Sequence, residues 1–357
     1  MKRYPGIQSF TADQSHLFKG REKESRELFQ LVVLNEIVVL FGKSGVGKTS
    51  LLQAAVCPEL EERNLHPVFI RLNQTQFSPE EQVYQFLKEK GYIPKDTPSG
   101  LTLWEYFKLF YYVDLGEVFK PVIVLDQFEE LFTLYKPKER LDFIQQFADI
   151  VNKQMPASLK GKDSAGNMET PPDIKFVISI RSDYLYLLDE LSPDIPAILR
   201  TRFQLRMLDR ANASEAITLP ASQSGDYESP HFSYSNAAID NIIETLGKAD
   251  SDALSSGRSG DEPEIEAFQL QLFCGSIEDK IIEQNEKSDF KVTPDYYGGT
   301  AGIDQIIGQF YSKVLSKVET GQQDAVEKLL ATGLIRNKRR IIMEESLIKE
   351  EFKISSE

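Results

Sequence analysis

Cysteine and histidine are scarce in this 357-residue chain. It has two cysteines, Cys57 and Cys274, and three histidines, and no histidine neighbours a cysteine in the sequence. Two cysteines cannot build a disulfide framework, and scattered histidines do not provide the ligand spacing of a structural zinc site. We therefore expect a fold that is stabilised by its own hydrophobic core in a reducing compartment, which favours the cytoplasm.

Long hydrophobic runs are also missing from the sequence. The longest apolar runs cover residues 37–41 and 122–125, whereas a membrane-spanning helix needs about 20 apolar residues. Residues 1–6, MKRYPG, lack the apolar core of a signal peptide. The hydrophobic share of 41% and the mean hydropathy of −0.32 are ordinary for a globular protein. At about 150 residues per domain, the length predicts two to three domains. The short apolar runs predict no membrane attachment.

Basic residues are outnumbered by acidic ones. The chain has 41 lysines and arginines against 55 aspartates and glutamates, a net charge of −14. The excess is uneven, because residues 1–210 carry 27 basic and 29 acidic side chains while residues 211–357 carry 14 and 26. A nucleic-acid-binding surface requires a basic footprint, so nucleic acid is not the expected partner.

Hydrophobic periodicity predicts alternating strands and helices over the first 210 residues. The expected strands cover residues 36–41, 68–72, 121–125, 174–180 and 203–207. The expected helices cover residues 22–33, 49–56, 80–90, 101–113 and 138–153. Strands that alternate with helices are joined by right-handed crossovers into a parallel sheet, so an α/β fold is predicted.

The second half of the sequence favours helices over strands. Helices are expected at residues 236–246, 265–285 and 303–318. Stretches rich in glycine, serine and proline predict loops at residues 156–172, 221–235 and 248–263. The last residues, 325–357, are expected to form a helix, a turn, a short strand at 341–343 and the start of a charged helix.

Residues 42–49, GKSGVGKT, match the phosphate-binding pattern G-x-x-x-x-G-K-[ST]. Glycines let the backbone turn sharply and direct successive N–H groups at phosphate oxygens, and the N-terminus of the next helix adds positive potential. Lys48 would reach the β- and γ-phosphates, and the Thr49 hydroxyl would bind Mg²⁺. The residues expected to contact the phosphates are Gly42, Ser44, Gly45, Val46, Gly47, Lys48, Thr49 and Ser50. The alternative is a glycine-rich turn with a surface lysine, but a strand precedes this loop and a helix follows it, as the motif requires.

Asp126 is the expected metal partner of Thr49. It follows the apolar run at residues 122–125, and ligands bind at the carboxyl ends of strands in an open parallel sheet. Its carboxylate would hold Mg²⁺ through water. The alternative is that Asp126 only caps the helix that follows.

The residues after Asp126 bear on hydrolysis. Many related ATPases carry an acid directly after this aspartate, whereas this chain has Gln127, which can orient a water but cannot take its proton. The nearest acids are Glu129 and Glu130. If a helix starts near Gln127, Asp126 and Glu130 are stacked at i, i+4, so Glu130 is the slightly favoured base. The alternative for both acids is a favourable charge in the first helical turn.

Arg181 ends the predicted strand at residues 174–180. At that position it would sense whether a γ-phosphate is present. The alternative is a surface arginine paired with Asp183.

Several segments together resemble the prokaryotic STAND NTPases, in particular the novel STAND group. Besides the phosphate loop, they are YPGIQSF (4–10), LFKGRE (17–22), VLDQFEELF (124–132), IRSDY (180–184), RFQL (202–205) and EAFQLQL (266–272). The resemblance covers essentially the whole chain. It implies an N-terminal adenine-side segment at residues 1–25, an AAA+/NACHT-like P-loop domain at 26–210, a helical lid domain at 211–320 and the start of a winged-helix domain at 321–357.

The resemblance also implies site residues and a mode of action. Phe18, Gly20 and Arg21 would lie beside the adenine, and Arg181 would be the sensor arginine. Family members are signalling switches that are ADP-bound and closed at rest, and ATP-bound and oligomeric when triggered, often in antiviral or programmed-death systems. In longer proteins they are linked to sensor and effector domains.

Two departures from the family pattern stand out. This chain has Ala267 where the helical-domain signature often has proline, and it ends at Glu357, where a winged helix should continue. The sequence is thus expected to be an N-terminal fragment of a longer protein or a stand-alone relative. Two further hypotheses stay open: a nucleotide-dependent interaction module with structural ADP and no turnover, and a DNA-processing ATPase, against which the acidic second half argues.

Overall fold

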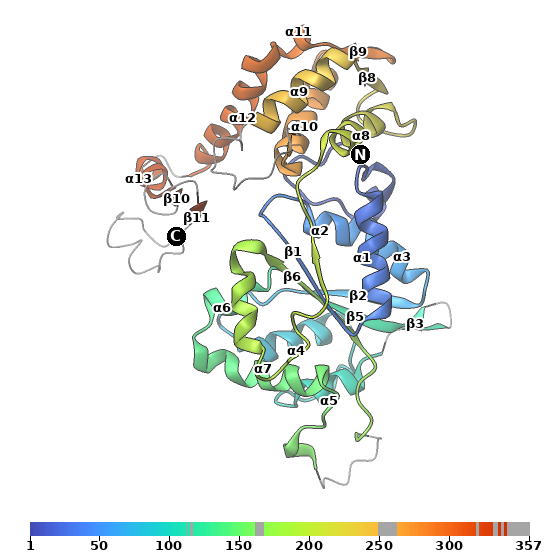
Figure 1. Cartoon of the computed structure of the whole chain (residues 1–357), viewed down its shortest axis with the longest axis vertical. Coiled ribbons are helices and arrows are strands. Elements are labelled where there is room, and N and C mark those ends of the chain that lie inside the picture. Colours follow the sequence, from blue (N-terminus) through green and yellow to red (C-terminus); the bar gives the residue numbers. More distant parts are fainter. Residues whose placement is uncertain are drawn as a thin grey trace.

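A five-stranded parallel sheet forms the centre of the computed structural model, which describes residues 1–111, 113–114, 117–160, 168–248, 263–318, 321–330, 335–336 and 339–340. Its strands are β1 (Ile37–Gly42), β2 (Leu65–Ile70), β5 (Lys120–Leu125), β6 (Lys175–Arg181) and β7 (Arg202–Gln204). Their order is β2-β5-β6-β1-β7 (Figure 1). Val39 of β1 pairs with Ile178 on one side and with Arg202 on the other. The loop that follows β1 therefore lies between two neighbouring strand ends.

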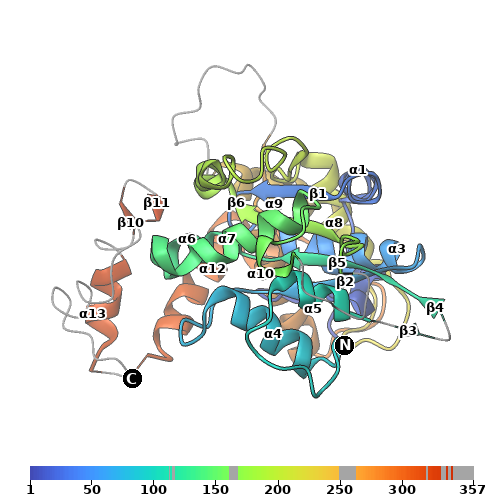
Figure 2. The same ribbon diagram turned by 90° about the horizontal axis from the view of Figure 1, so that it is seen from below.

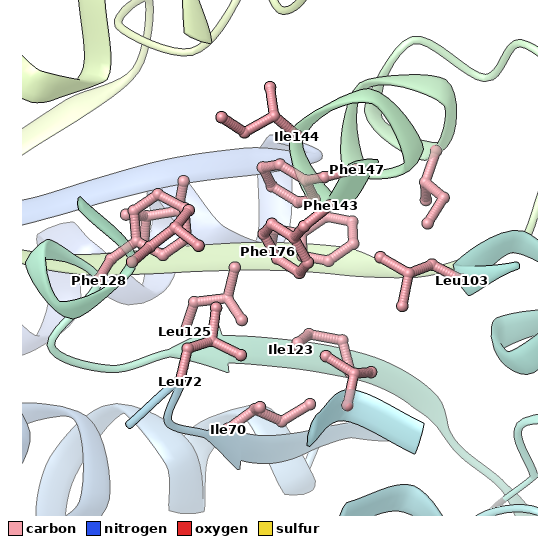
Figure 3. Close-up of a cluster of buried hydrophobic side chains, with 14 of the residues drawn as sticks. Ile70, Leu72, Leu103, Ile123, Leu125, Phe128, Phe143, Ile144, Phe147 and Phe176 are labelled. Atoms are coloured by element: carbon pink, nitrogen blue, oxygen red, sulfur yellow. The ribbon is translucent and has the colours of Figure 1, made fainter. Parts of the chain in front are cut away.

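Alternate residues of the strands feed two separate hydrophobic cores. Ile123 and Leu125 of β5 face the larger core, with Phe128, Phe147 and Phe176 (Figure 3). This face is covered by α4 (Pro79–Glu89), α5 (Leu103–Leu109), α6 (Glu129–Leu134), α7 (Pro137–Val151) and the 3₁₀ segment η4 (Ser182–Leu191). A strand that is buried on both faces is apolar throughout, which explains the continuous run in β5.

The opposite face of the sheet is covered by the segments that flank the phosphate loop. They are α1 (Glu22–Leu34), α2 (Lys48–Ser50), a π-helical stretch η2 (Leu51–Val56) and α3 (Cys57–Glu61). Val122 and Val124 of β5 point into this core. The domain thus has three layers, with the sheet in the middle.

A second, mainly helical domain follows β7 and has its own core. It consists of α8 (Arg210–Ser222), α9 (Asn236–Lys248), α10 (Ala267–Glu283), α11 (Pro294–Tyr297) and α12 (Gly299–Leu315), with the parallel pair β8 (Phe232–Tyr234) and β9 (Phe290–Val292). Figure 1 shows this domain at the carboxyl ends of the sheet strands.

The remaining elements of the described residues are short. They are η1 (Ala12–Leu17), η3 (Ala157–Leu159), α13 (Gln323–Lys328), and the antiparallel pairs β3 (Val113–Asp114) with β4 (Glu117–Val118) and β10 (Ile335–Arg336) with β11 (Arg339–Arg340). Both views place α13 on the opposite side of the molecule from α1 and α3 (Figure 2). Among the described residues, no helix has the length and hydrophobicity that crossing a membrane requires.

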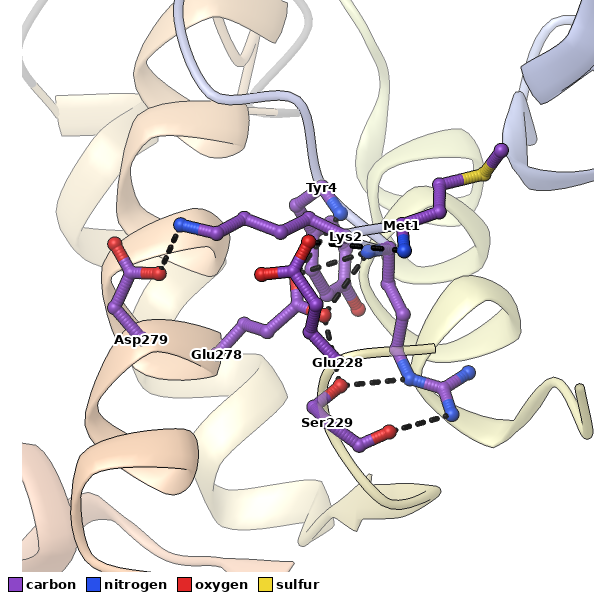
Figure 4. A network of polar contacts seen from close by, with 8 residues as sticks. Met1, Lys2, Tyr4, Glu228, Ser229, Glu278 and Asp279 are labelled. Carbon is purple, nitrogen blue, oxygen red and sulfur yellow. Dashed lines mark hydrogen bonds and ion pairs between the residues drawn. The ribbon is translucent and has the colours of Figure 1, made fainter. Parts of the chain in front are cut away.

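The first ten residues, here called the N-terminal strap, start on the helical domain and end at the P-loop domain, where Phe10 packs against Ala54. The fully buried Glu278 of α10 accepts hydrogen bonds from the backbone N–H groups of Arg3 (2.9 Å) and Tyr4 (3.1 Å) and from the Ser229 hydroxyl (2.7 Å) (Figure 4). The Tyr4 ring is buried in the core of the helical domain. The start of the strap therefore belongs structurally to a domain that begins about two hundred residues later in the chain.

The five strands and the parallel sheet are confirmed, with β2 shifted toward the N-terminus. The predicted helix at 101–113 is shorter, since α5 ends at Leu109. The predicted loop at 221–235 contains the end of α8 and the whole of β8. Most of the loop predicted at 248–263 and the strand predicted at 341–343 lie outside the described residues. The start of a winged helix at 321–357 stays a prediction, because only α13 and the β10–β11 pair are described there.

Candidate nucleotide site

The loop between β1 and α2 has the backbone geometry of a phosphate cradle. Gly45 and Gly47 have φ angles of +81° and +95°, values that other residues adopt only with strain. Gly42 is required for space, because a Cβ there would lie 2.5 Å from the Leu205 carbonyl oxygen. The predicted sequence of strand, glycine-rich loop and helix is therefore present.

Lys48 is folded back onto its own loop. Its ammonium group donates hydrogen bonds to the carbonyl oxygens of Gly42 (3.1 Å) and Lys43 (3.2 Å). Burial lowers the pKa of this lysine, and the carboxylates of Glu129 and Asp126 partly counteract that shift. A phosphate at the loop would supply the same kind of oxygen acceptor together with negative charge.

Thr49 and Asp126 meet at the carboxyl ends of β1 and β5. The Thr49 hydroxyl donates to Asp126 Oδ2 over 3.1 Å. The second carboxylate oxygen of Asp126 is buried and accepts no hydrogen bond from the described residues. A hydroxyl and a carboxylate are hard oxygen ligands of the kind that Mg²⁺ takes, together with waters and phosphate oxygens. The pair fits a magnesium ion.

The segment after Asp126 differs from the prediction. Gln127 has a φ of +54°, and α6 begins only at Glu129. The expected helix start near Gln127 is therefore wrong, and Asp126 and Glu130 are not stacked as i, i+4 neighbours on one helix. The reason for favouring Glu130 as the base is thereby lost.

Glu130 is held by an arginine that the sequence analysis did not single out. Arg71, which directly follows β2, donates from Nε to Glu130 Oε2 (2.8 Å) and from Nη2 to Oε1 (2.5 Å). The same guanidinium contacts the side-chain oxygen of Gln127. Burial raises the pKa of Glu130, while Arg71 lowers it. A bidentate pair with arginine restrains this carboxylate.

Glu129 and Glu130 both line the cavity at the phosphate loop, and Glu129 is the more buried of the two. The Glu129 side chain is 9% exposed, and its Oε2 accepts a hydrogen bond from the backbone N–H of Arg181 (3.3 Å). Its charge is the strongest of those that raise the Lys48 pKa. Of the two acids, Glu129 is the one that the structure places beside Lys48.

Arg181 has contacts that bear on both interpretations of the sequence, and its sensor role stays a prediction. One guanidinium nitrogen, Nη2, pairs with Asp183, as the alternative expected. Its Nε is buried and has no hydrogen-bond partner among the described residues, and the side chain lines the same cavity as the phosphate loop. An unpaired donor of this kind is suited to an anionic oxygen.

The predicted adenine-side residues connect the two domains. Gly20 has a φ of +78°, and a Cβ there would lie 2.2 Å from the Asn212 carbonyl oxygen in α8. Arg21 is buried and donates to the carbonyl oxygens of Arg206 (2.8 Å) and Val46 (3.3 Å). Arg21 thus links the phosphate loop to the segment that follows β7, and it also lines the cavity.

A cavity of about 1140 Å³ lies between the two domains and the strap. Its phosphate side is formed by residues 44–50 with Asp126, Glu129 and Arg181, and its other side by the strap, Phe18 and α10. The N-terminus of α10 closes it, since Phe268 N–H donates to the Gly45 carbonyl oxygen over 3.1 Å. Ala267 is part of this contact, because a Cβ on Gly47 would lie 4.0 Å from its methyl group. The sequence analysis did not predict that the strap and Gln271 line the cavity. The signal that pointed to them was the family resemblance of residues 4–10 and 266–272.

Comparisons with known proteins agree with this geometry. The sequence profile described as Novel STAND NTPase 1 matches residues 4–353. Among solved structures, the ORC2 protein of Aeropyrum pernix, in ADPNP-ADP complexes, is similar with a TM-score of 0.50 and 10% identity, covering 94% of this chain and 79% of that one. A Walker-type ATPase of Pyrococcus abyssi has a TM-score of 0.45 and 16% identity, covering 97% and 85%. Cdc6p of Pyrobaculum aerophilum has a TM-score of 0.48 and 14% identity, covering 76% and 64%. No curated protein matches.

At 10% identity the ORC2 structure supports the fold alone, a parallel sheet flanked by helices with a second domain. The profile match carries more than the fold, because one family model covers the strap from residue 4, the phosphate loop and the helical domain together. The chain belongs to the novel STAND NTPase 1 family.

Proposed function

We propose that this protein is a cytoplasmic signalling switch that binds ATP with Mg²⁺, hydrolyses it slowly and changes domain packing with the nucleotide state. The observation that carries the proposal is the hydrogen bond from Phe268 of α10 to Gly45 of the phosphate loop. A group that approaches the phosphates from the helical domain makes the packing of that domain depend on what the loop holds. Nucleotide-dependent packing is the physical basis of a two-state switch.

The site residues take the following roles in this proposal. Lys48 exchanges the carbonyl oxygens of its own loop for the β- and γ-phosphate oxygens. Thr49 and Asp126 hold Mg²⁺, which supplies charge neutralisation on the transferring phosphoryl group. Arg181 approaches the γ-phosphate through the donor that is unpaired in the described structure.

Glu129 is proposed as the acceptor of the proton from the attacking water. It is the acid beside Lys48, whereas Glu130 is occupied by Arg71. The carboxylate comes three residues after Asp126 rather than directly after it, and its Oε2 is engaged by the Arg181 N–H. A base that must reorganise before it acts supports slow turnover.

The family membership supports oligomerisation when ATP is bound, and linkage to sensor or effector domains in a longer protein. Defence against viruses is proposed on the same ground. The second candidate is an interaction module with structural ADP and no turnover. The pairing of Glu130 with Arg71 favours it, because one of the two nearby acids is removed from chemistry.

The experiment is to identify the nucleotide that copurifies with the protein and then to follow phosphate release in a single turnover with Mg²⁺. Slow release that is abolished in Lys48→Ala supports the switch. Bound ADP without any release over hours supports the interaction module. Failure to bind any nucleotide contradicts both.

A further inference from the structure

One polar group in the cavity wall has no role in phosphate or metal chemistry. Gln271 of α10 lines the cavity, and its side-chain oxygen is buried and without a hydrogen-bond partner among the described residues. Buried polar atoms in native proteins are nearly always paired. Two other residues of this wall, Asp126 and Arg181, also have an unpaired buried atom, and both already have roles in the proposed metal and γ-phosphate binding. The oxygen of Gln271 needs a different donor.

The register of α10 places Gln271 between the phosphate loop and the strap. Residues four apart share one face of a helix. On this face Ala267 lies against the phosphate loop, and Gly275 lies 3.6 Å, measured from its ideal Cβ position, from the Tyr4 carbonyl oxygen in the strap. At 1.5 Å per residue, Gln271 is about 6 Å along the helix from either contact. A nucleotide with its phosphates in the loop extends past this point.

The cavity that Gln271 lines also has apolar walls that suit a flat ligand. Phe10, Phe18, Leu208 and Ala216 line the same cavity, and Phe10 and Phe18 meet edge to face with ring centroids 5.4 Å apart. A purine base stacks on such walls and presents polar groups only at its edge. Gln8 and Gln127 also line the cavity, but neither has a buried, unpaired oxygen among the described residues. A carboxamide of this kind beside apolar side chains can fix the orientation and the specificity of a ligand.

We propose that Gln271 selects adenine over guanine at this site. A glutamine carboxamide is complementary to adenine, because its oxygen accepts from the 6-amino group and its nitrogen donates to the neighbouring ring nitrogen. In guanine and hypoxanthine the 6-oxygen and the neighbouring N7 both accept, so the carboxamide can make only one of the two hydrogen bonds, whichever way it is turned. The inference rests on the proposed nucleotide binding and adds the residue that reads the base.

The test compares ADP with IDP, which differ at the 6-position, by calorimetric titration of the full chain. Wild-type protein is expected to prefer ADP by about 5- to 150-fold, the range of one good bidentate contact. Gln271→Met keeps the side-chain length, removes both polar atoms and should reduce the preference to less than about threefold. Gln269→Met is the matched control on the same helix. Its amide donates to Glu266 over 3.1 Å and does not line the cavity, so the wild-type preference should remain.

The outcomes separate this inference from the proposed function. If wild-type protein binds neither nucleotide, the proposed function fails. If it binds ADP selectively and folded Gln271→Met keeps the full preference, the base is read elsewhere and the inference is overturned. Gln271→Asn withdraws the same amide by one methylene and should also lose the preference. Full selectivity in this variant, should Gln271→Met not fold, overturns the inference equally.

Discussion

Replacing Glu129 with glutamine tests the hydrolytic site most directly. The side chain is 9% exposed and lies beside Lys48, and glutamine keeps the oxygen that accepts the Arg181 N–H. The change therefore removes the proton acceptor and one negative charge while preserving shape. Losing a general base typically slows a reaction by about 10²- to 10⁴-fold, which at 1.36 kcal/mol per tenfold is about 2.7–5.4 kcal/mol of barrier. ATP should bind at least as tightly, because a charge that repels phosphate is gone.

The matched control is Glu130→Gln, one residue further along the same helix. Its carboxylate is paired with Arg71 at 2.5 and 2.8 Å, so its removal should change the rate by only a few-fold. Single-turnover phosphate release with saturating Mg²⁺ measures both variants, and thermal melting verifies that both are folded. Equal slowing in the two variants, or slowing in Glu130→Gln alone, would refute the assignment. Unchanged release in both would mean that neither carboxylate acts as the base.

Three further predictions follow from the same contacts. Lys48→Ala should weaken ATP binding by about 10- to 150-fold, the value of a charged contact to phosphate, without lowering the melting temperature much; unchanged affinity by calorimetry would contradict the phosphate-loop assignment. Asp126→Asn should slow hydrolysis far more than it weakens binding, because metal charge matters most as the phosphoryl group is transferred; a wild-type rate in Mg²⁺ would show that Asp126 has no metal role. Burial raises the pKa of Glu278 above its ordinary value of 4.5, so between the two pKa values the folded state holds a proton that the unfolded state has lost. The free energy of unfolding should therefore fall as the pH rises from 4.5 through the raised pKa. Glu278→Gln should flatten this fall of melting temperature with pH, and an unchanged fall would show that another group causes it.

The sheet was predictable because its strands are short, apolar and bounded by turn residues. The continuous apolar run at residues 122–125 is typical of a strand that is buried on both faces. The glycine-rich loop after residues 36–41 indicates the edge of the sheet at which ligands bind. The start of α6 was not predictable, because it depends on the positive φ of Gln127 and on its contact with Arg71. These residues are 56 positions apart in the sequence, and local periodicity carries no information on such a pair.

The strap was missed for a related reason. Residues 1–10 show no periodic pattern, and their docking depends on backbone N–H groups that meet Glu278 more than 270 positions later. A buried glutamate on a helix cannot be matched to backbone donors from sequence alone. The family resemblance indicated that this segment matters, and assigned it to the adenine side, but did not show that it is packed into the core of the helical domain.

The docking of the strap gives the polypeptide two crossings between its domains, one between residues 7 and 10 and one between β7 and α8. A rigid body held at one point turns freely about three axes, whereas a body held at two points turns only about the line that joins them. Two crossings therefore leave the helical domain fewer ways to turn relative to the P-loop domain than a single linker would. Releasing the strap from Glu278 should therefore add rotational freedom to the helical domain while leaving Lys48, Thr49 and Asp126 in place.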